Sequence, residues 1–505
     1  MIAKVRGSAV AAATCFPEVA SVRVWHSACG FTTPPIRLFT GSEGVQPPRK
    51  YTHGQKAEPT LNKKQWQLLS VVLIVAFFSL AGIIQAQFLA KDPGPRGDPA
   101  GAGVPYAALT SDELEMFDAG KKEFAEEDGL AEGLGPRFNF VSCGGCHSQP
   151  DVGGTSPAVN PLFRVVGDLG FGAGNVVPSF ITPDGPIKEA RFPYHPNGTR
   201  DGGVHALFVI AGHPDAVGCT IQQENFERQI LNNNIVFRIP TPIFGAGLIE
   251  QISDSTIVAN LAGNPFAKRI LGISGRPNRN GNDGRIARFG WKAQNQSLLL
   301  FSGEAYNVEM GITNELFPVE RDETGNCQYA MVPNNVTPSV RQLSAIENFA
   351  NFQRFLAPPT PVSSFGRASS FSVSRGRQRF TDVGCALCHT PALKTGSTTV
   401  GALRYQNVNL FSDLALHGMG PGLADDILQG AARGDEFRTS PLWGLGQRIF
   451  FLHDGRTNDL LEAIRAHGSA GNLKFGPSEA NAVIDRFNGL GEGDKQDLLN
   501  FLRSL

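Results

Sequence analysis

The stretch SCGGCHSQP, residues 142–150, holds two cysteines separated by two residues, with a histidine directly after the second. Such a cysteine pair is typical of a redox dithiol, of half of a zinc site or of a covalent haem attachment. The same pattern recurs in GCALCHTP, residues 384–391. A redox dithiol does not account for the two histidines, and the gap from Cys146 to Cys385 is far wider than zinc-ribbon spacing. Haem attachment explains every residue of both motifs, so the sequence predicts two covalently bound haems c.

In this interpretation each motif supplies the attachment points and one iron ligand. Cys143 and Cys146 form thioethers with the vinyl groups of the first haem, and His147 is its proximal ligand. The second haem is held in the same way by Cys385, Cys388 and His389. Bacteria attach haem c outside the cytoplasmic membrane, so the motifs also predict an exported protein.

The composition narrows the class of protein and of partner. The chain has 505 residues, 41% of them hydrophobic, which is enough for one large core or two to three smaller ones. Its net charge of −1 indicates neither a nucleic-acid partner nor an anionic membrane surface. The 58 glycines and 34 prolines predict much irregular backbone, or hairpins, between helices.

The N-terminal part has the character of a targeting segment. Lys63 and Lys64 precede an uncharged apolar run at 68–84, and Ala86 stands at a plausible cleavage point. A basic region, an apolar run and a small residue in this order indicate a signal peptide at 61–86. The run is also just long enough for a short membrane anchor. We therefore expect a periplasmic protein, either soluble or tethered by this segment.

Residues 1–60 fit neither interpretation, because they are non-periodic and rich in Pro, Thr and Arg. We expect a non-native or disordered extension, with the true start near Leu61. The alternative is a genuine cytoplasmic tail that precedes a membrane anchor. A Pro/Gly-rich linker at 87–105 then leads into the folded part.

Two cysteines, Cys219 and Cys327, lie after the leader and outside the haem motifs. In an oxidising compartment they are a candidate disulfide. The alternative is two separate buried thiols, since the sequence does not give their Cα separation.

Amphipathic helices frame both motifs. The first motif follows a helix that begins at a Thr110–Glu113 capping box. A later amphipathic segment follows each motif, at 345–359 and at 495–505. A terminal helix that packs back on the motif helix is the plan of a cytochrome c domain.

This organisation predicts a mainly α fold with two cytochrome c-like haem domains and much irregular structure. The first domain is expected at 106–358 and the second at 375–505, with a Pro/Ser-rich boundary between them. The first is much longer, because it carries an insertion at about 155–290 that we interpret as loops and short strands.

Several stretches resemble the bacterial di-haem oxidoreductase family, which is sometimes labelled thiol oxidoreductase and is related to di-haem cytochrome c peroxidases and MauG-type enzymes. The matching stretches span residues 110–505 and include GLGPRFNFVSCGGCHSQP, RFGWKAQNQSL, EMGITNELFP and FLHDGRTNDLLEAIRAHG. The thiol label does not fit the chemistry, because haem attachment uses both cysteine pairs. In the peroxidase relatives, one haem is the reaction site and the other relays electrons.

The resemblance implies roles for two side chains near the first haem. The stretch FGWKAQNQSLLLFSGEAYNVEMG aligns Trp291 with a tryptophan that lies between the haems of the relatives. It aligns Glu309 with a glutamate on the distal side of the first haem, where a carboxyl group can move a proton during peroxide cleavage. The alternatives are plain core packing for Trp291 and a solvated helix position for Glu309.

The distal ligand of the second haem is expected to be His467, which aligns with the Met or Tyr ligand of the relatives. His467 also shares the apolar face of a predicted helix with Leu460 and Ile464. A core histidine with satisfied hydrogen bonds is the alternative, and His417 and Met419 are rival ligands. Bis-His ligation gives a lower potential than His/Met ligation.

The first haem has no obvious distal ligand, which favours binding of peroxide or oxygen at its iron. Three later histidines remain as candidates for that position: His195, His205 and His213. Calcium, which the relatives bind between the haems, is only weakly supported, because Arg448 stands where they have a threonine.

The resemblance therefore implies an exported di-haem c oxidoreductase of the peroxidase type. It would reduce hydrogen peroxide or a related oxidant at the first haem, with electrons from a small periplasmic donor, a cytochrome c or a cupredoxin, relayed through the second. The alternatives are a non-catalytic electron-transfer cytochrome and a MauG-like or oxygenase enzyme that acts on a protein or organic substrate.

Overall fold

A computed structural model describes most of the chain after residue 88. The described ranges are 62–64, 66–68, 70–72, 89–97, 101–167, 174–200, 210–213, 215–219, 221–319, 327 and 342–505. The chain divides into two units, Met1–Ala76 and Phe77–Leu505. The expected extension at 1–60 and most of the expected signal peptide lie outside the described residues. Within the described ranges, no helix combines the length and the apolar character that crossing a bilayer requires.

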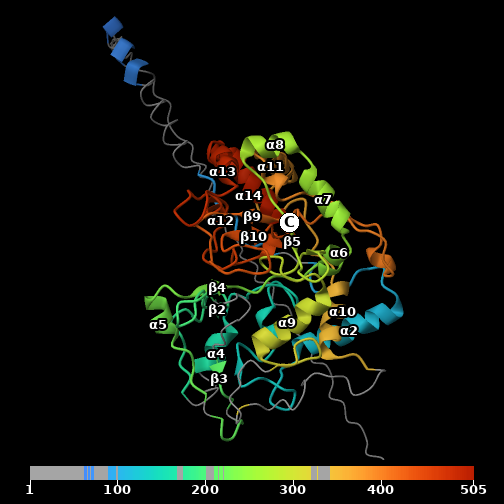
Figure 1. The fold of residues 1–505 in the computed structure, drawn as a ribbon. Helices are drawn as coiled ribbons and strands as arrows, with labels where there is room; N and C mark the ends of the chain where they lie inside the picture. Colours follow the sequence, from blue (N-terminus) through green and yellow to red (C-terminus); the bar gives the residue numbers. More distant parts are fainter. Residues whose placement is uncertain are drawn as a thin grey trace, which may run out of the picture. The chain divides into compact units, whose positions relative to one another are not determined.

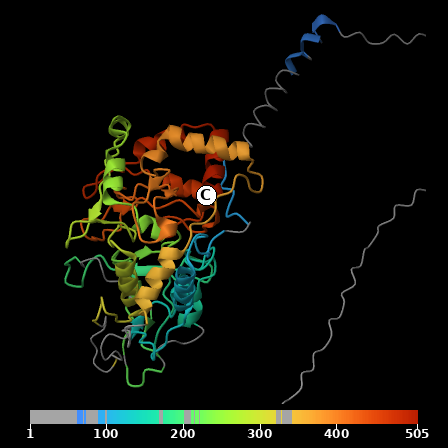
Figure 2. The ribbon, with the colours of Figure 1, turned by 90° about the vertical axis from the view of Figure 1, so that its right-hand side faces the viewer.

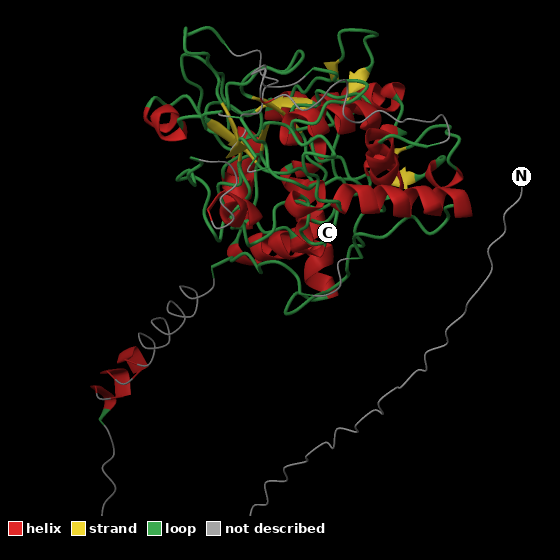
Figure 3. Cartoon of the chain, turned by 90° about the horizontal axis from the view of Figure 1, so that it is seen from below, coloured by secondary structure: helices red, strands yellow, loops and turns green. Residues whose placement is uncertain are grey.

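The second unit is mainly α, which confirms that part of the predicted fold class. Its described helices are α2 (Ser111–Ala125), α3 (Cys143–Cys146), α4 (Pro161–Gly167), α5 (Phe226–Leu231), α6 (Ala246–Glu250), α7 (Asp254–Ala262), α8 (Pro265–Leu271), α9 (Leu298–Met310), α10 (Ala345–Phe355), α11 (Ser370–Val383), α12 (Leu460–Arg465), α13 (Asn481–Asn488) and α14 (Glu492–Ser504). Short 3₁₀ helices lie at η2 (Cys385–Leu387), η3 (Gly401–Leu403) and η4 (Leu445–Gln447). Long loops connect these elements, as Figure 3 shows.

The strands are two or three residues long and pair only in twos. The antiparallel pairs are β1 (Arg137–Phe138) with β3 (Ile210–Ala211), β2 (Glu189–Arg191) with β4 (Val236–Arg238), β5 (Asn278–Arg279) with β6 (Ile286–Ala287), β7 (Leu393–Lys394) with β8 (Asn407–Val408), and β9 (Leu416–Gly418) with β10 (Glu436–Arg438). The predicted insertion at about 155–290 therefore contains short strands, but it also contains the short helices α4 to α8, which the sequence reasoning did not predict.

The first helix layer consists of α2, α9 and α10, which lie together in the lower part of Figure 1. The capping box predicted at Thr110 and Glu113 is confirmed at the start of α2. Gly120 lets α2 approach α10 closely, because a Cβ there would collide with the carbonyl oxygen of Asn348. Four residues later, Phe124 packs on α10 with its ring 5.0 Å from that of Phe352.

The C-terminal region repeats this packing with α11 and α14, which Figure 2 shows side by side. A Cβ at Gly376 would collide with the carbonyl oxygen of Asp497. Four residues after this glycine, Phe380 lies 5.4 Å from Phe501, ring to ring. Each Cys-x-x-Cys-His motif thus follows a helix with the same Gly-x-x-x-Phe spacing, and a later helix crosses that helix at the glycine.

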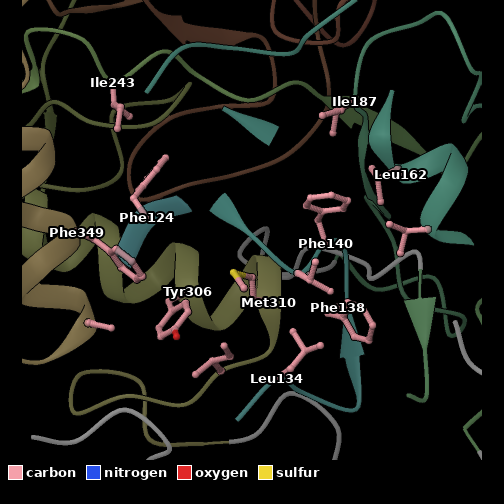
Figure 4. Packing of buried hydrophobic residues seen from close by; sticks show 14 of the residues in the cluster. Phe124, Leu134, Phe138, Phe140, Leu162, Ile187, Ile243, Tyr306, Met310 and Phe349 are labelled. Carbon is pink, nitrogen blue, oxygen red and sulfur yellow. The ribbon is translucent and has the colours of Figure 1, made fainter. Parts of the chain in front are cut away.

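A large apolar cluster surrounds the first motif and buries the side chains that Figure 4 draws, among them Phe124, Phe140 and Met310. A second cluster surrounds the second motif and joins α11, α12, α13 and α14. Both clusters border the motif cysteines, which are themselves partly buried. The two cores therefore form around the two motifs.

Two long-range links bind distant segments of the second unit. Cys219 and Cys327 form a disulfide with a Cα separation of 4.8 Å, so the candidate bridge is confirmed. Asp92, from the expected linker at 87–105, forms an ion pair of 2.6 Å with Arg503 of α14. Since the side chain of Arg503 is fully buried, the described residues 89–97 lie packed against the C-terminal helix.

Candidate functional site

The first Cys-x-x-Cys-His motif is ordered by a single helical turn. Cys143 and Cys146 are the ends of α3, and His147 follows as its C-terminal cap. The Nδ1 atom of His147 lies 3.0 Å from the carbonyl oxygen of Gly154. A hydrogen bond from Nδ1–H to this oxygen leaves Nε2 as the lone-pair nitrogen, which is the arrangement of a metal-ligating histidine. The Phe124 ring lies 5.9 Å from the imidazole.

The second motif has the same geometry on an unrelated stretch of chain. Cys385 begins η2, and the Nδ1 atom of His389 lies 3.0 Å from the carbonyl oxygen of Phe411. The Phe380 ring lies 6.3 Å from this imidazole. Burial lowers the pKa of His147 and of His389 to about 4, so both rings are neutral near pH 7 and can ligate a metal.

The four motif cysteines are free thiols, unlike the bridged pair elsewhere in the chain. Burial raises the pKa of Cys143 and Cys146 far above the ordinary value, and it raises the pKa of Cys385 to about 12. Thiols of this kind do not form the thiolate that disulfide exchange requires. In the described part of the chain, no group of three or more His, Cys, Asp or Glu side chains is arranged to hold a metal ion.

Each motif opens onto its own cavity. The first cavity contains both cysteines and the histidine of the first motif, with apolar walls from Phe124, Phe140, Leu162, Ile187 and Ile243. The second cavity contains those of the second motif, with apolar walls from Leu442, Phe451, Ile464, Val483 and Leu498. A cavity with many apolar lining residues, one neutral imidazole and two thiols fits a covalently attached haem.

Trp291 lines both cavities and therefore forms part of the wall that they share. Its indole Nε1–H donates a hydrogen bond of 3.0 Å to the carbonyl oxygen of Ile239. Its ring lies edge-on to His453, with 6.3 Å between the ring centroids. The sequence reasoning chose Trp291 for a position between two haems, and the side chain lies between the two candidate haem cavities.

Glu309, near the end of α9, lies in the first cavity together with the first motif. Burial raises its pKa to about 8. The charge of Glu189 adds to this shift, while the charge of Arg191 opposes it. The Glu309 carboxyl group is therefore mainly protonated at neutral pH and can donate a proton inside the cavity.

The first cavity also contains charged residues that the sequence reasoning missed. Glu189 and Arg191, at the two ends of β2, form an ion pair of 2.9 Å, and both line the cavity. Arg238 reaches the cavity from β4, where it pairs with Glu189 in the strand register. The alternation of EAR on a strand places residues 189 and 191 on one face, but nothing in the sequence indicated that this face borders the first motif.

Two of the three candidate distal histidines of the first haem, His195 and His213, do not line that cavity. His195 lies in the hairpin loop beyond β2, and His213 is bonded through Nδ1 to the backbone N–H of Asp215. Neither is among the residues that line the first cavity. His205 lies outside the described residues.

The three candidate second ligands that line the second cavity differ in the hydrogen bonds that their donor atoms make. His467 lines the cavity, and its Nδ1 lies 2.8 Å from the carbonyl oxygen of Ala463, which leaves Nε2 free. His417 also lines the cavity, but Asp413 and Glu479 lie 3.0 and 2.9 Å from its two ring nitrogens. Met419 is a third lining residue. Both nitrogens of His417 are thus occupied, whereas His467 keeps one for a ligand.

Two arginines also line the second cavity. Burial lowers the pKa of Arg438 to about 10 and that of Arg448 to about 10, so both guanidinium groups remain charged at neutral pH. Arg438 donates from Nε to the carbonyl oxygen of Gly290 at 3.0 Å.

Comparisons with known proteins identify a family for most of the chain. A family model described as "Di-haem oxidoreductase, putative peroxidase" matches residues 190–505. A search of curated proteins finds no match. Among solved structures, the chain is similar to a di-haem peroxidase from Burkholderia thailandensis, with 14% identity, 83% of this chain and 94% of that chain covered, and a TM-score of 0.31.

Two other solved structures show weaker overlap. One is a MauG-like protein associated with microbial copper homeostasis, at 16% identity, with 53% of this chain and 91% of that chain covered and a TM-score of 0.25. The other is hydrazine synthase from Kuenenia stuttgartiensis, at 19% identity, with 32% of this chain covered and a TM-score of 0.22. The match spans 55% of the length of the hydrazine synthase chain.

Proposed function

The chain belongs to the family of di-haem oxidoreductases and peroxidases, and on this premise we propose that it reduces hydrogen peroxide with electrons relayed between two covalently held haems. One observation carries the proposal: two motifs that orient their histidines in the same way open onto two cavities that share the Trp291 side chain as a wall. Such a pair of sites suits an enzyme in which one haem reacts and the other supplies electrons.

The side chains of each motif are proposed to hold one haem. Cys143 and Cys146 would form thioethers, and the Nε2 atom of His147 would ligate the iron, oriented by the Gly154 carbonyl. The second motif would do the same through His389 and its own cysteines. When bound, a haem in the first cavity supplies an iron centre that takes up peroxide and transfers electrons to it.

Glu309 is proposed as the group that moves the proton. Cleavage of the O–O bond requires that the oxygen that leaves as water gains a proton. A protonated carboxyl group can donate its proton to this oxygen while its carbonyl oxygen takes the proton of the other peroxide oxygen. The raised pKa of about 8 keeps Glu309 in the donating form near neutral pH. Glu189 forms an ion pair of 2.9 Å with Arg191, so the two carboxyl groups have different environments.

Trp291 is proposed to lie on the electron path between the haems. Its hydrogen bond to the Ile239 carbonyl and its contact with His453 hold the indole in one orientation. The shared wall makes Trp291 a short route between the two cavities.

His467 is proposed as the second ligand of the second haem, because its Nε2 is free while both nitrogens of His417 are bound by carboxylates. Arg438 and Arg448 are proposed partners for the carboxylates of this haem, since both are buried cations that line the second cavity. The positive charge of Arg448 speaks against calcium at that position.

The electron donor is proposed to be a small redox protein of the periplasm, a cytochrome c or a cupredoxin, and the enzyme is proposed to be exported. To test the proposed function, we would express the full chain with haem c attachment machinery, count haems by the pyridine haemochrome method, and measure peroxide-dependent oxidation of a reduced cytochrome c. We expect two haems per chain and one after joint substitution of Cys385→Ser and Cys388→Ser. Absence of covalent haem, or of any peroxide-dependent oxidation, would contradict the proposal.

A further inference from the structure

A fully buried ammonium group lies next to Trp291. The Lys292 side chain is 0% exposed, and its Nζ donates to the carbonyl oxygens of Glu436 at 2.8 Å and Arg433 at 2.9 Å. The carboxylate Oδ1 of Asp425 lies 3.0 Å from the same nitrogen. The face of the Phe437 ring covers it, with 4.0 Å between Nζ and the ring centroid.

Asp425, Phe437 and the carbonyl groups of Arg433 and Glu436 thus form a cage around the Lys292 ammonium group. Two of these residues, Asp425 and Phe437, connect the cage to the two cavities. The other carboxylate oxygen of Asp425 accepts from Nη2 of Arg238 at 2.6 Å, and Arg238 lines the first cavity. Phe437 lines the second cavity and stacks on His453, with 4.3 Å between the ring centroids. Lys292 and Arg238 therefore share one buried carboxylate, and the charge of Asp435 also acts on Lys292.

The oxygen atoms around the Lys292 ammonium group are of the kinds that coordinate hard metal cations. A carboxylate and several backbone carbonyl oxygens are typical ligands of Ca²⁺, and here a lysine fills their centre. An unpaired ammonium at this depth would be costly, so the hydrogen bonds and the shared carboxylate are what keep Lys292 charged. Burial nevertheless lowers its pKa to about 8, while the charge of Asp425 acts in the opposite direction.

The cage also fixes the turn that carries Trp291. Directly after Lys292, Ala293 holds φ at +50°, a left-handed conformation that a residue with a Cβ rarely adopts. The carbonyl oxygen of Trp291 accepts from the backbone N–H of Arg438 at 2.9 Å, on β10, which also carries the Glu436 carbonyl group. Because Lys292 and Trp291 are neighbours in the chain, the anchored ammonium restricts where the indole can lie.

We propose that Lys292 is a tethered cation that takes the place of a metal ion at the junction of the two cavities, where it positions Trp291 and adds a fixed positive charge between the haems. The contacts of Lys292 support the cage independently of the proposed function, and only the effect on the haems rests on that function. A buried charge is weakly screened, so it stabilises the reduced form of a nearby haem and raises its potential.

The test compares the full haem-loaded chain with its Lys292→Ala variant. Thermal unfolding is followed by circular dichroism and the two midpoint potentials by spectroelectrochemical titration, each in sodium chloride, ethylammonium chloride or calcium chloride of equal ionic strength. We expect Lys292→Ala to lose thermal stability and at least one potential to fall. Ethylammonium or calcium should restore both properties in a saturable manner, because either cation can enter the emptied cage.

Lys268→Ala is the matched control. The Lys268 side chain is also buried, and its Nζ donates to the carbonyl oxygens of Leu261 at 3.0 Å and Asn260 at 3.2 Å, but it lines neither cavity. This control should lose stability with unchanged potentials and no saturable recovery. Unchanged potentials in Lys292→Ala, no recovery with either cation, or equal recovery of the control would overturn the proposal.

A second variant covers the case in which Lys292→Ala does not accumulate. Lys292→Met fills the cage without the charge, so at least one haem midpoint potential should fall in this variant. Neither cation should restore that potential. Unchanged potentials would again overturn the proposal. A wild-type chain that binds no haem would contradict the proposed function instead, and the unfolding measurements would still test the cage.

Discussion

Replacement of Glu309 by glutamine removes the proposed proton donor and keeps the shape of the side chain. General acid–base groups contribute about 100- to 10,000-fold to rates, so Glu309→Gln should lower kcat/KM for peroxide by that factor. At about 1.36 kcal/mol per tenfold change, this loss corresponds to about 2.7–5.4 kcal/mol of transition-state stabilisation. Haem content and the visible spectrum should not change, because the carboxyl group is not an attachment residue.

The pH dependence gives the sharper test. Burial raises the pKa of Glu309 to about 8, so the donating form dominates below this pH and is lost above it. The wild-type kcat/KM should therefore fall about tenfold per pH unit above pH 8. The Glu309→Gln variant should not show this decrease above pH 8, since glutamine does not titrate. The assay is stopped-flow oxidation of a reduced cytochrome c by peroxide between pH 6 and pH 10.

Glu304→Gln is the matched control on the same helix. Glu304 accepts a hydrogen bond from Asn295 and does not line the first cavity, and its charge contributes to the raised pKa of Glu309. Removal of the Glu304 charge should leave the maximum rate unchanged, and the decrease of kcat/KM should begin at a lower pH. If Glu309→Gln kept the wild-type rate, or if both variants lost activity equally, the assignment of Glu309 as the proton donor would be wrong.

Three further predictions concern the rest of the site. His467→Ala should convert a low-spin haem into a high-spin one in the visible spectrum, whereas His417→Ala should not, since both nitrogens of His417 are occupied; the reverse pattern would contradict the ligand assignment. Trp291→Phe should slow electron transfer between the haems in flash photolysis at unchanged haem content, and an unchanged rate would exclude the indole from the path. Although burial alone would raise it, the hydrogen bond and charge of His417 hold the pKa of Glu479 at about 2, below the ordinary 4.5. Because the pKa of Glu479 is lower in the folded state, Glu479→Gln should reduce the free energy of unfolding by its full amount above about pH 4.5. This reduction should disappear as the pH falls toward 2, as measured by urea unfolding. A reduction that does not depend on pH would contradict this pairing.

The two Cys-x-x-Cys-His motifs could be recognised from the sequence alone, because each is contained within five residues. A Cys-x-x-Cys-His unit names both attachment points and the ligand, and the structure adds only the carbonyls of Gly154 and Phe411 that orient the imidazoles. The crossing helices were also predictable from local periodicity. The Gly-x-x-x-Phe spacing at Gly120 and Gly376 was present in the sequence, but its meaning follows only from the helix that packs on it.

The charged network between the cavities could not be predicted, because it is assembled from distant segments. Arg238 and Asp425 are 187 residues apart in sequence, and Lys292 meets carbonyl groups more than 140 residues away. No periodicity or motif brings such residues together. Glu189 was missed for the same reason, since β2 reaches the first cavity only through its pairing with β4.

The central claim is tested most directly by rapid mixing of the half-reduced, haem-loaded chain with one equivalent of hydrogen peroxide, followed by visible and EPR spectroscopy. The account predicts one high-spin haem with an open position, and rapid oxidation of the reduced haem after peroxide binds. Two low-spin haems that peroxide leaves unchanged would contradict it, and the chain would then be an electron-transfer cytochrome.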